Sequence, residues 1–238
     1  MTAALPPIVD RETWRRRREQ LLGREKAHTR EGDVIAAARR RLPMSEVDGS
    51  VELVGADGPT TVLAMFEGRD QLVVCKHMWH RGKGFEDQCQ GCTATIWNFQ
   101  DATYLEARRV TFAIWCEGPY EELAPFREFM GYRSPWYSID GVDAPGISDG
   151  WLNAYLRVGD RVFQTYETDG RGCEAMMPAL QLLDLTVYGR QEGWEDAPSG
   201  WPQDPTQSWF RRDGRPIAQW TRPGVTPSGS KPAPPAPR

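Results

Sequence analysis

The sequence predicts an α/β domain in which a mixed central sheet is flanked by helices. Two continuous apolar runs, 71–75 and 110–116, are typical of strands that are buried on both faces. Apolar residues recur at helical spacing over 119–131, a stretch that begins with proline and ends with glycine, as many helices do. Two further extended stretches flank Gly159-Asp160, a turn signal that predicts a hairpin.

The N-terminal part of the chain is predicted to be a helical arm. Asp10 can cap a first helix that Gly32 interrupts, and Asp33 can cap a second helix over 34–42. Apolar residues form only a thin stripe along these helices, so the arm needs contact with the body or with a second subunit to be ordered.

The body alternates strands with helices. Short extended pieces are expected at 51–54 and 61–66, ahead of the first apolar run. A helix of about 17 residues should begin near Cys92 and end near Arg109. The last elements are a strand at 135–139, the hairpin, and a helix over 173–184. The order strand, helix, strand, helix, strand, strand, helix is that of a thioredoxin-like core.

Changes in composition set the expected boundaries. Four tryptophans are spread through Gly/Pro-rich sequence after residue 189, too many for a free tail, so this stretch should wrap the body or a neighbouring subunit. The expected segments are a helical arm at 1–48, a thioredoxin-like domain at 49–188, a Trp-rich extension at 189–221 and a disordered Pro-rich tail at 222–238.

Charge is distributed unevenly along the chain. Residues 10–42 carry 11 Lys and Arg against 6 Asp and Glu, a net +5, and the whole chain carries −4, which leaves −9 for the rest. A basic arm beside an acidic body predicts docking within a homodimer. No interleaving of aromatic and basic residues accompanies the charge, so no nucleic-acid partner is expected.

Apolar content indicates where the protein resides. No apolar run reaches the roughly 18 residues that span a bilayer, and the first 30 residues contain no segment typical of a signal peptide. We therefore expect a cytoplasmic protein with no membrane partner. The five cysteines are an odd number at scattered positions, which indicates buried, catalytic or metal-bound thiols and not a disulfide framework.

Chemistry-bearing residues concentrate in the stretch 76–93, which holds two of the five cysteines and two of the three histidines. Cys89 and Cys92 fall between an apolar strand and a predicted helix, where a helix N-terminus lowers the pKa of a thiol. Cys75 and Cys116 lie inside apolar runs and are expected to be core residues.

Four segments of the chain carry a resemblance. They are Leu42-Pro43-Met44-Ser45-Glu46-Val47-Asp48, Cys89-Gln90-Gly91-Cys92, Phe129-Met130-Gly131-Tyr132 with Pro135-Trp136-Tyr137-Ser138, and Leu182-Leu183-Asp184-Leu185-Thr186 with Gly189-Arg190. Together they resemble the bacterial thioredoxin-like proteins catalogued as domain of unknown function eight-nine-nine. The resemblance runs from about residue 10 to 195 and implies a thioredoxin-like fold, in a family without a settled activity.

The loop before the cysteine pair departs from the commoner form of that family, in which it is acidic and contains tryptophan. Here the stretch 79–85 is basic and rich in glycine, and it contains His80. The departure indicates a specialised subgroup with its own substrate.

The first functional interpretation is a redox pair, which would make the protein an oxidoreductase. Cys89 would be the nucleophile and Cys92 the resolving thiol, acting on a small thiol or another small molecule. The intervening Gln90-Gly91 differs from the Gly-Pro of thioredoxins, so a general disulfide reductase is not expected. Glu86 stands where peroxiredoxins carry threonine, and no histidine follows Cys92 to indicate covalent haem.

The second interpretation is a metal centre. His77, His80, Cys89 and Cys92 are soft or borderline ligands that could hold copper or zinc, giving a metal-dependent enzyme for a small sulfur-containing or aromatic substrate, or a structural site. A third interpretation is a non-catalytic binding protein on the same fold.

Six further residues are candidates for substrate binding. Arg81 and Arg171 could bind an anionic group. Four aromatic side chains could line a pocket near the cysteines, namely Trp79, Phe85, Trp136 and Tyr137.

Overall fold

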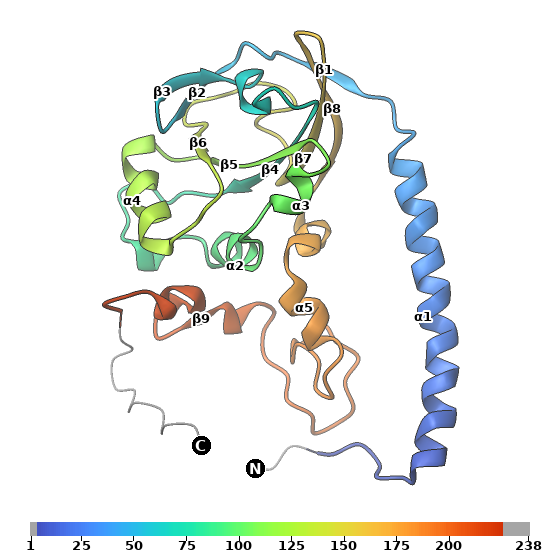
Figure 1. Ribbon diagram of the computed structural model, residues 1–238. Helices are drawn as coiled ribbons and strands as arrows, with labels where there is room; N and C mark the ends of the chain where they lie inside the picture. Colours follow the sequence, from blue (N-terminus) through green and yellow to red (C-terminus); the bar gives the residue numbers. More distant parts are fainter. Residues whose placement is uncertain (1–3, 226–238) are drawn as a thin grey trace.

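An eight-stranded mixed sheet organises the fold, in the order β1-β8-β7-β4-β5-β6-β2-β3 (Figure 1). The computed structural model describes residues 4–225 of the chain. The strands are β1 Ser45–Val47, β2 Glu52–Gly55, β3 Gly58–Thr61, β4 Gln71–His77, β5 Val110–Cys116, β6 Trp136–Ser138, β7 Leu152–Val158 and β8 Arg161–Thr168. The sheet is curled, and helices flank it.

Helices and short 3₁₀ segments connect and cover the strands. The α-helices are α1 Arg11–Arg39, α2 Gln90–Asn98, α3 Thr103–Glu106, α4 Tyr120–Met130 and α5 Pro178–Leu183. The 3₁₀ segments are η1 Ala64–Phe66, η2 Phe85–Asp87, η3 Gly170–Met176, η4 Ser208–Phe210 and η5 Ile217–Thr221, and a two-stranded ribbon pairs β9 Arg211–Arg212 with β10 Arg215–Pro216. In the part of the chain that the structure describes, every helix is too short or too polar to cross a membrane.

The centre of the sheet separates two apolar cores. β4 runs parallel to β5 and antiparallel to β7, and β7 pairs with β8 as the predicted hairpin. Successive side chains of a strand point to opposite faces. Accordingly Ala113 and Trp115 of β5 enter one core, while Phe112 and Ile114 enter the other. This burial on both faces explains the continuous apolar runs.

Helix α4 has the predicted start and end. Pro119 precedes it, and Gly131 ends it at φ 68°, in the left-handed region that glycine adopts without strain. Its buried residues Leu123, Phe126 and Met130 pack into the same core as Ile96 of α2. The two helices therefore cover one face of the sheet.

Helix α1 corrects the prediction of two N-terminal helices. Asp10 caps it as expected, accepting a hydrogen bond from the Thr13 backbone N–H at 2.8 Å. The helix then continues through Gly32 to Arg39 as one element of 29 residues. One glycine inside a helix costs only about 1 kcal/mol relative to alanine, which long flanking turns tolerate. The interruption at Gly32 was therefore wrong.

Two other predicted helices are each divided. The helix expected from Cys92 to Arg109 ends at Asn98, and Asp101 then begins a separate turn by accepting the Thr103 backbone N–H at 2.8 Å. Asn and Asp side chains compete with helical backbone bonding in this way. The helix expected over 173–184 is a 3₁₀ segment followed by α5, with the break at Met177.

The expected strand at 61–66 is also displaced. Residues 58–61 form β3, which pairs with β2, and the chain then turns into η1. Glu67 follows with φ 50°, a turn conformation that extended backbone excludes.

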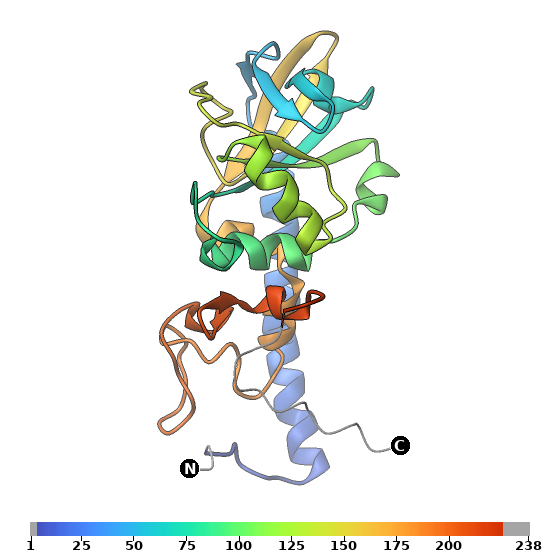
Figure 2. The same ribbon diagram turned by 90° about the vertical axis from the view of Figure 1, so that its left-hand side faces the viewer.

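The segment after residue 189 packs against α2 and α5 (Figures 1 and 2). Phe210 joins Met177 and Leu180 in a small apolar cluster, and Ala218 enters the core beneath α2. Arg222 donates to the Met130 carbonyl at 3.0 Å, so the disordered tail does not begin there. The rest of the predicted tail, 226–238, lies outside the described residues.

Candidate functional site

Cys89 and Cys92 lie together at the N-terminus of α2. Cys89 is the N-cap residue, and its Sγ accepts the Cys92 backbone N–H at 3.3 Å. The Sγ of Cys92 lies 2.8 Å from the Sγ of Cys89. Both thiols are free. The pair lies at a connection from strand to helix, as predicted, and the Cys-x-x-Cys spacing there places the two sulfur atoms in direct contact.

The environment separates the acidities of the two thiols. Hydrogen bonding from the Cys92 side chain, helped by the backbone N–H groups of Cys92 and Gly91 and by charge on His80, lowers the pKa of Cys89 to about 6. The Cys92 thiol donates that hydrogen bond and is buried, so its pKa is raised well above the ordinary value. Cys89 is thus the thiolate at neutral pH, and Cys92 keeps its proton.

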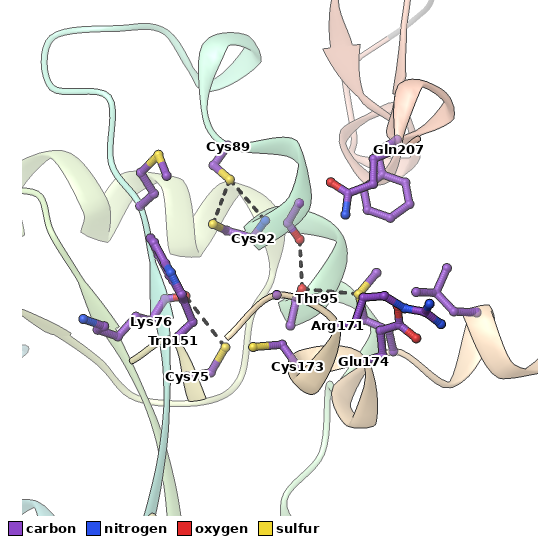
Figure 3. A pocket seen from close by; sticks show the side chains of 16 residues that line it. Cys75, Lys76, Cys89, Cys92, Thr95, Trp151, Arg171, Cys173, Glu174 and Gln207 are labelled. Carbon is purple, nitrogen blue, oxygen red and sulfur yellow. Dashed lines mark hydrogen bonds and ion pairs between the residues drawn. The ribbon is translucent and has the colours of Figure 1, made fainter. Parts of the chain in front are cut away.

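A cavity of about 350 Å³ opens beside the pair (Figure 3). Its walls come from five parts of the chain: β4 with the residue after it, the start of α2, the residue before β7, the segment from η3 to α5, and the C-terminal segment. Most of the lining is apolar or sulfur-containing, and includes Met78, Trp151, Met177, Leu180 and Phe210. Such a cavity accepts a small molecule with an apolar body.

The wall opposite the cysteine pair is held by ion pairs. Arg190 is almost completely buried and binds Glu174 at 2.9 Å and Asp184 at 2.8 Å. Arg171, at the edge of the cavity, binds Glu174 at 3.0 Å and lies over the Trp194 ring at 4.3 Å. These contacts join the C-terminal segment to η3 and fix the cavity wall.

The loop before the pair is closed by one buried amide. Gln88 is completely buried, and its side-chain Oε1 accepts the His80 backbone N–H at 2.9 Å. Its Nε2 donates to the His80 carbonyl at 3.1 Å and to the Lys83 carbonyl at 3.3 Å. Arg211, from the C-terminal segment, donates to the Gln88 carbonyl at 2.7 Å. Hydrogen bonds within the chain therefore hold this loop in place.

Comparison with known families places the chain. The family described as "Bacterial protein of unknown function (DUF899)" matches residues 3–215. The chain belongs to the DUF899 family. This agrees with the resemblance carried by the four sequence segments, and the match spans every element that lines the cavity. A search of curated proteins finds no match.

In this DUF899 member the four predicted metal ligands are not assembled. His77 is fully buried among the rings of Trp79, Phe126 and Trp136, and its Nδ1 donates to the Met78 carbonyl at 2.6 Å. Burial lowers the pKa of His77 to about 4, so the ring is neutral at neutral pH.

His80 makes a different contact, in which its Nδ1 donates to the Asp87 carbonyl at 2.7 Å. Across residues 4–225, no group of three or more His, Cys, Asp or Glu side chains is arranged to hold a metal ion. A centre made of His77, His80, Cys89 and Cys92 would need His77 to leave the aromatic core. Copper or zinc binding stays a prediction that elemental analysis of the purified protein checks.

Of the six predicted substrate-binding residues, Arg171 alone lines the cavity that the cysteine pair shares. Trp79 and Trp136 are buried in the core behind the site, where Trp79 donates to Glu122 at 2.7 Å. Tyr137 packs against the core on the other face of the sheet. Neighbouring residues of a strand face opposite sides of the sheet, but the sequence does not show which side carries the cavity.

Phe85 and Arg81 also point away from the cavity. Phe85 packs against Phe126 and Phe129. Arg81 forms an ion pair with Asp140. The predicted aromatic pocket is therefore part of the core. Apart from three cysteines and Arg171, the residues that line the cavity were not singled out by the sequence.

Proposed function

We propose that this DUF899 protein is a thioredoxin-like redox protein whose Cys89 and Cys92 exchange between dithiol and disulfide with a small thiol or another small molecule. The observation that carries the proposal is the contact of 2.8 Å between two thiols whose pKa values are displaced in opposite directions. The element order β4, α2, β5, α4, β7, β8, α5, with the pair at the start of α2, supports a thioredoxin-like core.

The chemistry follows thiol–disulfide exchange. The Cys89 thiolate attacks one sulfur of a small-molecule disulfide, forms a mixed disulfide and releases the first thiolate. Cys92 then loses its proton to that thiolate and attacks the Cys89 sulfur, which releases the second thiolate. Two electrons pass from the protein to the substrate, and the pair becomes a disulfide. A low-molecular-weight thiol reverses these steps and regenerates the dithiol.

Protein disulfides are poor substrates for this geometry. Cys89 is partly buried, and Gln207 and Phe210 of the C-terminal segment form part of the cavity wall next to α2. A folded partner protein would have to displace that segment. The cavity admits a small molecule without such a change. The five free cysteines also support a cytoplasmic location, where thiols are kept reduced.

Trapping of a mixed disulfide tests the proposal. With an aromatic disulfide reporter, the wild-type protein should release two thiols per pair, whereas Cys92→Ala should release one and keep the reporter bound to Cys89. Cys89→Ala should lose the fast reaction. Cys116→Ala, which removes a buried thiol outside the cavity, is the matched control and should behave as wild type. Slow and equal reaction of all five cysteines would instead support the non-catalytic binding protein.

A further inference from the structure

A second pair of thiols lines the same cavity. Cys75, in the second half of β4, is 3% exposed, and Cys173, in η3, is partly exposed; both lie in the cavity wall with Cys89 and Cys92. Figure 3 shows the sulfur atoms of Cys75 and Cys173 pointing toward one another from β4 and η3. Four of the five cysteines in the chain therefore share one cavity.

The fold places these two residues together although 98 positions separate them, as their numbers show. Cys75 lies opposite Leu152 in β7, and Leu152 lies opposite Thr168 in β8. The chain then folds back in η3, where the Cys173 thiol donates a weak hydrogen bond to the Thr168 carbonyl at 3.8 Å. The Cys75 thiol makes only a similar contact, with the Lys76 carbonyl at 3.8 Å. Neither thiol has a strong partner that would fix it.

The positions of the four cysteines indicate the order in which the two pairs would react. Figure 3 shows Cys92 on the side of Cys89 that faces Cys75 and Cys173. When Cys89 and Cys92 form a disulfide, Cys92 is the sulfur nearer the second pair. Attack on Cys92 expels Cys89, the better leaving group because its pKa is the lower one.

We propose that Cys75 and Cys173 are a second dithiol that takes over the oxidation of the first pair. This inference rests on the proposed redox function of Cys89 and Cys92. The Cys173 sulfur, having lost its proton to solvent, attacks Cys92 and releases the Cys89 thiolate. The Cys75 thiol then attacks Cys173, closing a Cys75–Cys173 disulfide, and its proton passes to the departing Cys92 sulfur. One disulfide is broken and one is formed, so the exchange needs no further oxidant.

The exchange doubles the number of substrate molecules that one chain can reduce before it needs an external thiol. After the exchange, Cys89 and Cys92 are again a dithiol and can reduce a second substrate molecule before any external thiol arrives. Cys116 offers the internal comparison, because it is just as buried as Cys75 but does not line the cavity.

Peptide mapping after limited oxidation tests the exchange. Trypsin places Cys75 on 70–76, Cys89 and Cys92 on 84–108, Cys116 on 110–127 and Cys173 on 172–190. The reduced protein is treated anaerobically with one equivalent of the thiol oxidant diamide, which takes two hydrogens from a thiol pair. Samples are then alkylated over time. We expect 84–108 to lose two hydrogens first, and a linked pair of 70–76 with 172–190 to grow as that signal declines.

Variants separate exchange from direct oxidation. Cys89→Ala should slow formation of the linked pair at least tenfold, Cys173→Ala should abolish it, and Cys116→Ala should leave it unchanged. Without reductant, wild type should consume two equivalents of an aromatic disulfide and Cys173→Ala one. If 84–108 forms its disulfide but the linked pair never appears, or appears equally fast in Cys89→Ala, this inference is overturned while the proposed function stands. If 84–108 forms no disulfide at all, the proposed function itself fails.

Discussion

The Sγ atoms of Cys89 and Cys92 lie 2.8 Å apart, and the backbone N–H of Cys92 points at the same Cys89 sulfur from 3.3 Å. One residue thus supplies two donors to the other. A negative charge on Cys89 is stabilised, and a negative charge on Cys92 is opposed, because it would face the Cys89 sulfur from a buried position.

The first prediction concerns the acidity of Cys89. Its rate of alkylation by iodoacetamide should rise with pH through a midpoint at about 6. In Cys92→Ala the midpoint should move toward the roughly 8.5 of a free thiol, because the strongest stabilising donor is gone. Cys116→Ala provides the control and should keep the wild-type midpoint. A wild-type midpoint near that of a free thiol would contradict the assigned nucleophile.

His77 predicts a pH dependence of stability. Burial holds its pKa at about 4, against 6.5 for the exposed ring, so between these values the unfolded chain binds more protons than the folded one. The free energy of unfolding should therefore fall as pH decreases from 6.5 to about 4, by about 3 kcal/mol from this group.

Urea unfolding of wild type and His77→Phe across that range measures the difference. Carboxylates titrate in both proteins. The contribution of His77 is therefore the change with pH in the difference between the two free energies of unfolding. Phenylalanine suits a site surrounded by three aromatic rings and has no proton to bind. Parallel stability curves for the two proteins would show that His77 is not buried in its neutral form.

Gln88 is predicted to hold the loop before the cysteine pair. Gln88→Ala removes the amide that accepts from His80 and donates to the His80 and Lys83 carbonyls. We expect the free energy of unfolding to fall by about 2 kcal/mol, and trypsin to cut faster after Arg81 and Lys83. Gln181→Ala, at an exposed position of α5, should change neither quantity. Equal proteolysis of the two variants would assign the order of the loop to other contacts.

Arg190 is predicted to keep the C-terminal segment on the cavity wall. Arg190→Met leaves Glu174 and Asp184 without their shared partner. The unfolding free energy should fall by on the order of 2 kcal/mol, because each charged hydrogen bond contributes modestly and Asp184 is partly solvated. Cys89 should also react faster with a polymer-linked maleimide, because release of the C-terminal segment would widen access to the cavity. Arg212→Met, at an exposed position, is the matched control.

Helix α1 predicts a homodimer. It has no buried residue over its 29 positions, and Trp14, Leu21 and Ile35 expose apolar side chains on it, while the helix lies alongside the body in both views (Figures 1 and 2). A helix with this surface and a positive charge fits the acidic body of a second copy. Light scattering should give a dimer mass, and Leu21→Glu with Ile35→Glu should give a monomer. Gln20→Glu should remain dimeric; a monomeric wild type would exclude the dimer.

Local sequence determined much of the secondary structure and the primary site. The apolar runs of β4 and β5, the Gly159-Asp160 hairpin and the proline and glycine that bound α4 each act within a few residues, so their patterns are readable directly. The Cys-x-x-Cys spacing belongs to the same class, because four residues at a helix start are enough to bring two sulfur atoms together.

Tertiary structure alone decided what surrounds that pair. The orientation of His77 and Trp136 depends on which core each face of the sheet meets. Both side chains point into the core, although their positions in the sequence were compatible with a functional site. Cys173 reaches the cavity of Cys75 through strand pairings across β7 and β8, and Phe210 arrives from a segment packed over α2. Contacts between residues far apart in the chain leave no periodic or spaced signal in a single sequence, because they are selected by burial and shape in the folded state.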